Sequence, residues 1–449
     1  MSAREARPHE PVTIYGNHNP RCATPSRSIG RRWLRPLEPG RVARLAAGTT
    51  RAMHWQPRVT TTLMLGIAQT LAWASSYYLP AVLADAMGHD TGMPASGVFG
   101  AFSMALLCSA GIGPWAGRAI DRFGGRPVLV TSNLVFAVGL VVMSQATRPA
   151  HVFAAWAVMG LAMGSGLYEA AFATVVRLHG QGARRSITGI TLLAGFASTV
   201  GWPLTAYLEA RLGWRGACLA WAALHVWLGL PLNAMLPKIA PGDAPAAGAS
   251  AGPATAAPGL APTQQRRAAW LMACVFAAAW FISTAMAAHL PQVLQAWGVT
   301  LAAAIGIAAL VGPAQVAGRL IEFTVLKRAH PLLSARLATL AHPLGVLLLL
   351  LLGGYAASAF AVLHGLGNGI LTIAIGTLPL LLFGAHGYGQ RQGWLMVPAR
   401  IVQAGAPFLF GLAVERWGGQ ALWLSGALGI VAFVALAILA ADMRRAAAA

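Results

Sequence analysis

The stretch LPAVL at Leu79–Leu83 recurs in the second half of the chain as LPQVL at Leu290–Leu294. Two more pairs follow in the same order, about 200 residues apart: GRAID at Gly117–Asp121 with GRLIE at Gly318–Glu322, and GSG at Gly164–Gly166 with GNG at Gly367–Gly369. Repeats that keep their order and nearly keep their spacing are typical of a duplicated bundle of membrane helices. The pattern therefore favours a transporter.

The composition excludes a water-soluble protein. Hydrophobic residues make up 57% of the chain and charged residues only 10%, whereas soluble domains carry about 25% charged residues. A helix needs about 20 apolar residues to cross a bilayer. The chain contains twelve such segments, at about 60–82, 95–116, 128–146, 152–176, 187–208, 216–236, 269–290, 301–321, 331–352, 355–383, 394–414 and 420–441. We expect an all-α membrane protein with twelve transmembrane helices in two pseudo-symmetric six-helix halves.

Composition also divides the chain into parts. Two stretches, one rich in Arg and Pro and one rich in Ala, Gly and Pro, cannot bury enough apolar surface to fold. Met53 closely precedes the first apolar segment, so an alternative is that translation begins there and the preceding residues are a misassigned start. The expected parts are a disordered N-terminal extension (1–58), a six-helix half (59–237), a flexible linker (238–267), a second six-helix half (268–442) and a tail (443–449).

The net charge of +20 does not indicate a nucleic-acid partner, because its placement follows the membrane. The basic residues lie ahead of the first apolar segment and in alternate loops, and the opposite loops hold few. Positive loops stay on the cytoplasmic side of a membrane. We therefore expect a multi-pass monomer in a bacterial cytoplasmic (inner) membrane, with both termini and the linker in the cytoplasm.

A charged motif follows the second apolar segment and reads GRAIDRFGGR at Gly117–Arg126. It resembles the signature that the major facilitator superfamily carries between helices 2 and 3, which reads Gly, three residues, Asp, Arg or Lys, any residue, Gly, and then basic residues. Gly125 stands where many members have Arg, and the resemblance covers about 60–441. The matching positions are Gly117, Asp121, Arg122, Gly124 and Arg126.

The resemblance implies the twelve-helix fold of that family and a gating role for the motif. In the family, the Asp makes contacts at the cytoplasmic end of helix 11 that hold the outward-facing state closed on the inside. The same role is implied for Asp121. The alternative is a charged loop that only sets the orientation of the chain in the membrane.

The fourth apolar segment carries an acid. A charge near the centre of a membrane segment costs about 2.5–3.5 kcal/mol, so such residues tend to be functional. Ser165, Tyr168 and Glu169 share one face of a continuous helix in this segment. Glu169 is the deepest acid in the chain, which makes it a candidate proton-binding site. The alternative is a structural ion pair between Glu169 and Arg177.

Three further segments carry polar and aromatic residues at helical spacing. Helices 1, 4, 7 and 10 line the central cavity in the resembled family, so these residues are candidates for the pathway of substrate and protons. For each aromatic residue, the alternative is packing or anchoring at the membrane interface. They are Gln69, Trp73, Ser76 and Tyr77 in the first segment, Trp280, Ser283 and Thr284 in the seventh, and Asn368 and Thr372 in the tenth.

Arg400 lies more than one turn inside the eleventh segment, with Gln403 one turn further on. A buried cation in a central cavity is a natural partner for an anionic substrate. The alternative is that the Arg400 side chain extends to the cytoplasmic interface, because its segment enters the membrane from that side.

No cofactor and no metal are expected, because the histidines lack the spacing of metal ligands. The sequence contains no Gly-x-x-x-x-Gly-Lys-Ser/Thr loop for ATP, no zinc-protease motif and no serine nucleophile elbow. The chain is therefore not expected to be an enzyme. Its energy must come from an ion or substrate gradient.

These observations favour a secondary transporter that moves a small organic anion together with protons by alternating access. Drug or metabolite efflux by proton antiport is an alternative, although the fifth segment offers only Gly201-Trp202-Pro203 where drug antiporters of the family carry Gly-Pro-x-x-Gly-Gly. A non-transporting membrane sensor or scaffold is the alternative from another class. The expected partners are a small-molecule substrate, protons and the lipid bilayer.

Overall fold

The computed structural model describes residues 57–238 and 262–448. Nearly all of the predicted extension (1–58) and most of the predicted linker (238–267) lie outside these ranges. The described residues belong to one compact unit. They form helices and the turns between them, with no strand in either range.

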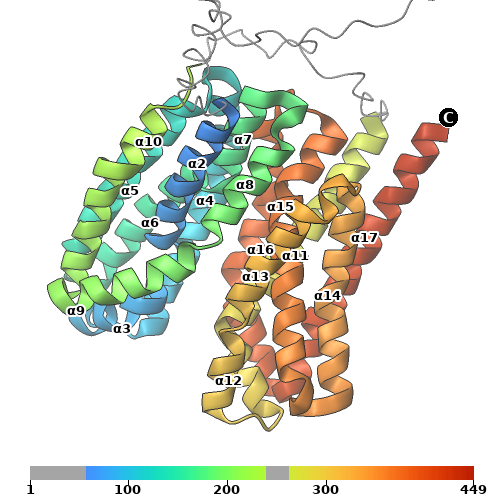
Figure 1. Cartoon of the computed structure of the whole chain (residues 1–449). Helices are drawn as coiled ribbons and strands as arrows, with labels where there is room; N and C mark the ends of the chain where they lie inside the picture. Colours follow the sequence, from blue (N-terminus) through green and yellow to red (C-terminus); the bar gives the residue numbers. More distant parts are fainter. Residues whose placement is uncertain (1–56, 239–261, 449) are drawn as a thin grey trace, which may run out of the picture. The chain divides into compact units, whose positions relative to one another are not determined.

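The first half of the bundle comes from residues 57–238 (Figure 1). Its α9 contains a chain reversal at Gly213, where the backbone has φ 68°, a left-handed conformation that glycine adopts without strain. Short 3-10 and π turns connect some of the helices. The helices are α2 (Pro57–Ala74), α3 (Pro80–Thr91), α4 (Ala95–Phe123), α5 (Gly125–Ser144), α6 (Pro149–Gly166), α7 (Tyr168–His179), α8 (Arg184–Ala194), α9 (Ala197–Leu224) and α10 (Leu230–Ala234).

The second half comes from residues 262–448. Its first helix starts with Pro262, a residue type that fits the first turn of a helix, and covers the last residues of the predicted linker. Its last helix continues through the predicted tail up to Ala448. The helices are α11 (Pro262–Ala296), α12 (Leu301–Ala308), α13 (Val311–Thr324), α14 (Pro331–Leu352), α15 (Ala357–Phe383), α16 (Tyr388–Trp417) and α17 (Leu422–Ala448).

Seven stretches of the described chain are long and apolar enough to cross a membrane. Three of them, of 86, 53 and 59 residues, are far too long for a single crossing and contain several helices each. Together with α2 they accommodate the twelve predicted crossings. The prediction of an all-α membrane protein built from two six-helix halves is confirmed.

Four predicted crossings are each divided into two helices. The first divides into α2 and α3, with a turn over 75–79, the fifth into α8 and α9, and the eighth into α12 and α13. The fourth breaks at Leu167, which is extended at φ −84° and ψ −163°. The break leaves the carbonyl of Gly166 outside the helical pattern, and the Gln69 side-chain amide donates to this carbonyl at 2.6 Å. A residue of the first crossing thus stabilises the break in the fourth.

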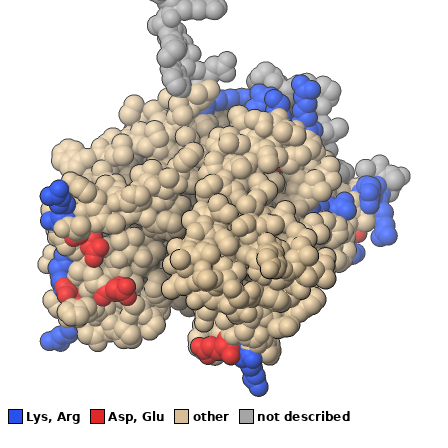
Figure 2. Space-filling model, turned by 60° about the horizontal axis from the view of Figure 1, so that its bottom comes forward, with Lys and Arg blue, Asp and Glu red and all other residues tan. Residues whose placement is uncertain are grey.

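Antiparallel helices give the bundle two ends. The end that holds the Gly117–Arg126 motif, the start of α8 and the start of α16 is called the basic end here, because it carries most of the arginines in the loops. The opposite end holds α3 and α12 (Figure 1). Figure 2 brings this opposite end forward and shows a mostly uncharged surface with small groups of acidic and basic side chains at its rim.

Candidate functional site

A buried ion pair joins the two halves near the middle of the bundle. Arg400 on α16 donates from Nη2 to Glu169 Oε1 at 2.9 Å. Its Nη1 donates to Gln403 Oε1 at 2.8 Å. Arg400 is 2% exposed, so its side chain does not extend to the interface. Glu169 does not pair with Arg177, whose Nε lacks a hydrogen-bond partner in the described protein.

The hydrogen bonds continue from this pair to two other helices. The Gln403 side-chain amide donates to the Tyr77 hydroxyl at 3.1 Å. The Tyr77 hydroxyl lies 3.3 Å from Thr284 Oγ1, within hydrogen-bonding distance. Tyr77 follows the end of α2 and Thr284 lies on α11. Residues far apart in the sequence therefore form one polar network between the halves.

Aromatic side chains surround the network. The Arg400 guanidinium carbon lies 4.9 Å from the Trp280 ring centroid, in cation–π geometry. The ring of Trp280 stacks on that of Trp73 with centroids 6.2 Å apart and planes 3° from parallel. Tyr168 adds a third ring, whose centroid is 4.8 Å from that of Trp73. We call Trp73, Tyr77, Tyr168, Glu169, Trp280, Thr284, Arg400 and Gln403 the central cluster.

The remaining sequence candidates lie outside the central cluster. The break at Leu167 separates Ser165 from the helix of Tyr168 and Glu169, so the predicted shared face is wrong. The Ser165 hydroxyl donates to a carbonyl of its own helix, and the Ser76 hydroxyl, in the turn after α2, donates to the Ala72 carbonyl. The Gln69 side chain binds the Gly166 carbonyl at the break. A separate polar group joins Ser283, Asn368 and Thr372: Asn368 donates to Ser283 Oγ at 3.1 Å, and Thr372 donates to the Asn368 carbonyl at 2.8 Å.

The predicted gating motif contacts the start of α16. The carboxylate of Asp121 accepts hydrogen bonds from the backbone N–H groups of Gly389 at 2.9 Å and Gln390 at 2.8 Å. These N–H groups belong to the first turn of α16, where no helical carbonyl can accept them and where the helix dipole favours a negative charge. Gly117 permits the close approach, because a side chain there would collide with the Gly389 carbonyl.

The other residues of the motif occupy the turn that follows. Gly124 ends α4 with φ 83°, a conformation that favours glycine. The Arg122 guanidinium lies over the Phe123 ring at 5.0 Å. Arg126 is the second residue of the next helix, α5, which begins at Gly125.

A second contact between the halves at the basic end was missed by the sequence analysis. Arg184 on α8 donates to Glu322 Oε1 at 3.0 Å and to the Ala329 carbonyl at 3.2 Å. Glu322 on α13 is 4% exposed. The repeat supplied a signal, because Glu322 occupies in GRLIE the place that Asp121 occupies in GRAID. No repeat or motif in the sequence marked Arg184 as the partner of Glu322.

Two groups of buried histidines also lack a sequence signature. His225 lies 2.7 Å from Ser75 Oγ and 2.9 Å from Asn133 Oδ1, inside the first half. His342 and His364 face each other in the second half with their Nδ1 atoms 3.1 Å apart. Neither group contacts the central cluster through a described hydrogen bond.

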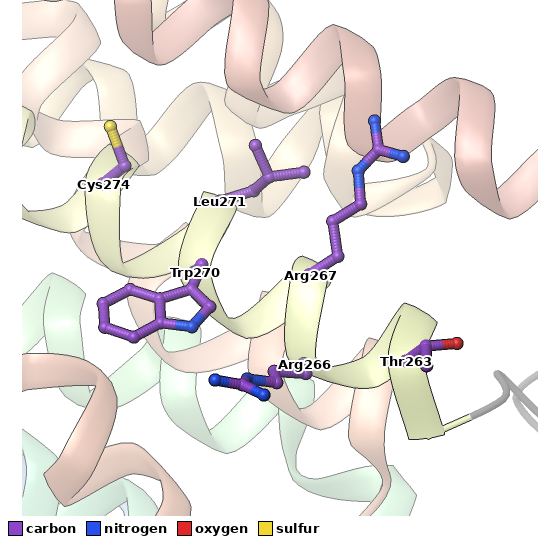
Figure 3. Close-up of a pocket in the computed structure, with 6 residues that line it drawn as sticks. All are labelled: Thr263, Arg266, Arg267, Trp270, Leu271 and Cys274. Carbon is purple, nitrogen blue, oxygen red and sulfur yellow. The ribbon is translucent and has the colours of Figure 1, made fainter.

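A pocket of about 440 Å³ lies away from the central cluster, at the basic end of α11 (Figure 3). In Figure 3, Arg266 and Trp270 lie on the same side of the helix, and Arg267 extends away from them. Arg267 pairs with Asp442 at 3.3 Å. Because Trp270 is 65% exposed, this pocket lies on the outer surface of the bundle. Exposed Trp and Arg at a helix end are typical of anchoring at a membrane interface.

Comparison with known proteins identifies the family. Residues 65–397 match the model of the Major Facilitator Superfamily. Over 151 residues the chain is 28% identical to human monocarboxylate transporter 11, covering 32% of this chain and 31% of that protein. Over 136 residues it is 30% identical to multidrug resistance protein MdtH of Yersinia enterocolitica, covering 28% of this chain and 33% of that protein. Each match thus spans about a third of the relative's length.

The fold is similar to that of a solved transporter. The E. coli fucose:proton symporter matches with a TM-score of 0.65, at 13% identity, over 86% of this chain and 99% of that one. At this identity the likeness concerns the fold alone. The matched family is one of transporters, so the expectation that the chain is not an enzyme is confirmed.

Proposed function

Because the chain belongs to the major facilitator superfamily, we propose that it moves a small organic anion together with protons by alternating access. The observation that carries this proposal is the buried pair of Arg400 and Glu169 between the halves. A buried cation needs a counter-charge. In the described protein, Glu169 is the acid in contact with Arg400.

The pair offers a direct route to coupling. A proton on Glu169 removes the counter-charge of Arg400, and the anion of a substrate then replaces it on the guanidinium. Proton and anion are therefore favoured together, which is the requirement for symport. Release of the anion restores the pair and expels the proton.

The contacts at the basic end support the alternating-access part of the proposal. Under the positive-inside rule the basic end is cytoplasmic. Asp121 and Glu322 both bind across the halves at this end. The conformation is therefore closed toward the cytoplasm, and the halves rock about the central cluster to open it. We propose a bacterial inner membrane as the location and a monomer as the functional unit.

The two curated relatives point to different substrates. The partial likeness to a monocarboxylate transporter favours the organic anion. The partial likeness to a multidrug resistance protein favours the second candidate, which is efflux by proton antiport. Antiport predicts that substrate binding releases a proton from Glu169, whereas symport predicts that it takes one up.

The glutamine variant of Glu169 tests the coupling. Glu169→Gln mimics the protonated acid, so it should abolish the accumulation of a carboxylate driven by a pH gradient in proteoliposomes. Exchange of labelled for unlabelled carboxylate should persist, because exchange needs alternating access but no net proton movement.

Acetate, lactate and benzoate serve as the probes, and Glu415→Gln, at an exposed position of α16, serves as the control that keeps both activities. If Glu169→Gln still accumulates the probe with an unchanged pH dependence, Glu169 is a structural partner and the coupling site lies elsewhere.

A further inference from the structure

The contact between the two halves at the central cluster is aromatic on both sides. Trp73 comes from α2 and Trp280 from α11, and their rings lie within 3° of parallel. The centroid of Tyr77 lies 5.1 Å from that of Trp73, so a further ring borders the same place. A substrate that binds between the halves at this depth has to replace the contact between the two indoles. A flat aromatic ring replaces it with the same stacking geometry.

Both indoles have an unused polar group. The Nε1–H of Trp73 and that of Trp280 are buried, and neither has a hydrogen-bond partner in the described protein. Trp73 is only 4% exposed. A buried donor without a partner is destabilising, and buried indoles usually find an acceptor. The two N–H groups therefore point to a ligand that brings an acceptor oxygen into the cluster.

The cation lies next to the aromatic surface. Arg400 is within 4.9 Å of the Trp280 ring, so a carboxylate on the guanidinium places whatever it carries close to the indole. In a short acid, the group that lies close to the indole is the one bonded directly to the carboxylate. The distance thus favours an acid whose ring is attached at or near the carboxyl carbon.

We infer that the substrate is a planar aromatic monocarboxylate, with its ring against the Trp73 and Trp280 indoles and its carboxylate on Arg400. Its oxygens accept from the indole N–H groups. This inference rests on the proposed function, because it assumes that Arg400 receives an organic anion. It adds that the rest of the anion is aromatic.

Benzoate and cyclohexanecarboxylate test this inference, because they share charge and size and differ in aromaticity. Calorimetric titration of the purified full chain should show benzoate binding about tenfold more tightly, because an aromatic ring stacks on the indoles and a cyclohexane ring does not. Trp280→Leu should remove most of this preference, and Trp280→Phe should keep part of it because it keeps a ring. Trp227→Leu is the control, because Trp227 is 81% exposed, and it should leave the preference unchanged.

The outcomes separate this inference from the proposed function. Equal affinities of the parent chain for the two acids, both lost in Arg400→Ala, would overturn the aromatic inference and leave the organic anion in place. A preference for benzoate that survives in Trp280→Leu would also overturn it. Binding of both acids that is unaffected by Arg400→Ala would contradict the proposed function itself.

Discussion

At the scale of single residues, the ion pair of Glu169 and Arg400 joins the two halves at the central cluster. Glu169 and Arg400 stand out because ionisable residues inside membrane segments are costly. That they bind each other is set by how the two halves dock, and 231 positions separate them in the chain. Arg177, which is close to Glu169 in the sequence, was the natural alternative and is not its partner. The spacing of residues along the sequence does not show whether Arg177 or Arg400 pairs with Glu169.

Asp90, at the end opposite the basic end, gives a prediction of pH dependence. Hydrogen bonds from Trp214 and Arg215, and then from His89, lower the pKa of Asp90 from 3.8 to about 2. A carboxyl whose pKa is lower in the folded state contributes stability that is present above the unfolded pKa of 3.8 and lost as the pH falls toward 2. Asp90→Asn should therefore lower the thermal unfolding temperature at neutral pH.

The pH series distinguishes this contact from a general effect of removing a charge. The difference between Asp90→Asn and the parent chain should shrink once the pH falls below 3.8. Asp85→Asn changes an exposed acid on the same helix and should have little effect at any pH. A difference for Asp90→Asn that is constant across the series would show that the ionised carboxylate is not what stabilises this end.

At the scale of elements, hydropathy predicted the crossings but not their interruptions. A helical period assigns Ser165 to the face of Glu169, and the break at Leu167 removes it. The break depends on tertiary contacts: Gln69 binds the freed carbonyl of Gly166, and a side chain at Gly166 would collide with Ser132. These contacts come from other helices, so the sequence around the break does not reveal them.

The contact between α4 and α16 predicts the behaviour of a gating variant. Asp121→Asn keeps the size of the side chain but removes its charge and one of the two acceptor oxygens that bind α16. A hydrogen bond to a charged group contributes about 1.5–3 kcal/mol, so the state closed at the basic end should become about tenfold less favoured. Benzoate exchange in proteoliposomes should slow, while benzoate affinity stays close to that of the parent chain.

The control for this variant is Asp442→Asn, because Asp442 pairs with Arg267 on the outer surface of the second half. It should leave the rate of exchange unchanged. If Asp121→Asn instead lowered benzoate affinity tenfold, which is about 1.4 kcal/mol, and left the rate intact, the gating assignment would be wrong.

At the scale of the whole molecule, the repeat predicted two halves, and the family assignment agrees with it. The sequence did not predict how the halves meet. The described hydrogen bonds between them lie at the central cluster and at the basic end, through Arg400, Asp121 and Arg184. Of the two contacts at the basic end, the one between Arg184 and Glu322 was indicated only by the repeat of GRAID as GRLIE. Docking of two halves is a property of surfaces assembled from many helices, so no single motif encodes it.

The central claim is that an anion and a proton bind together, because the proton neutralises Glu169 and the anion then takes the place of Glu169 on Arg400. Calorimetric titration of the purified chain with benzoate, at neutral pH in two buffers of different ionisation enthalpy, measures the protons taken up on binding. The account predicts an uptake of about one proton per benzoate bound by the parent chain, and none by Glu169→Gln, which should still bind. Benzoate binding by the parent chain without proton uptake, or with proton release, would contradict the account.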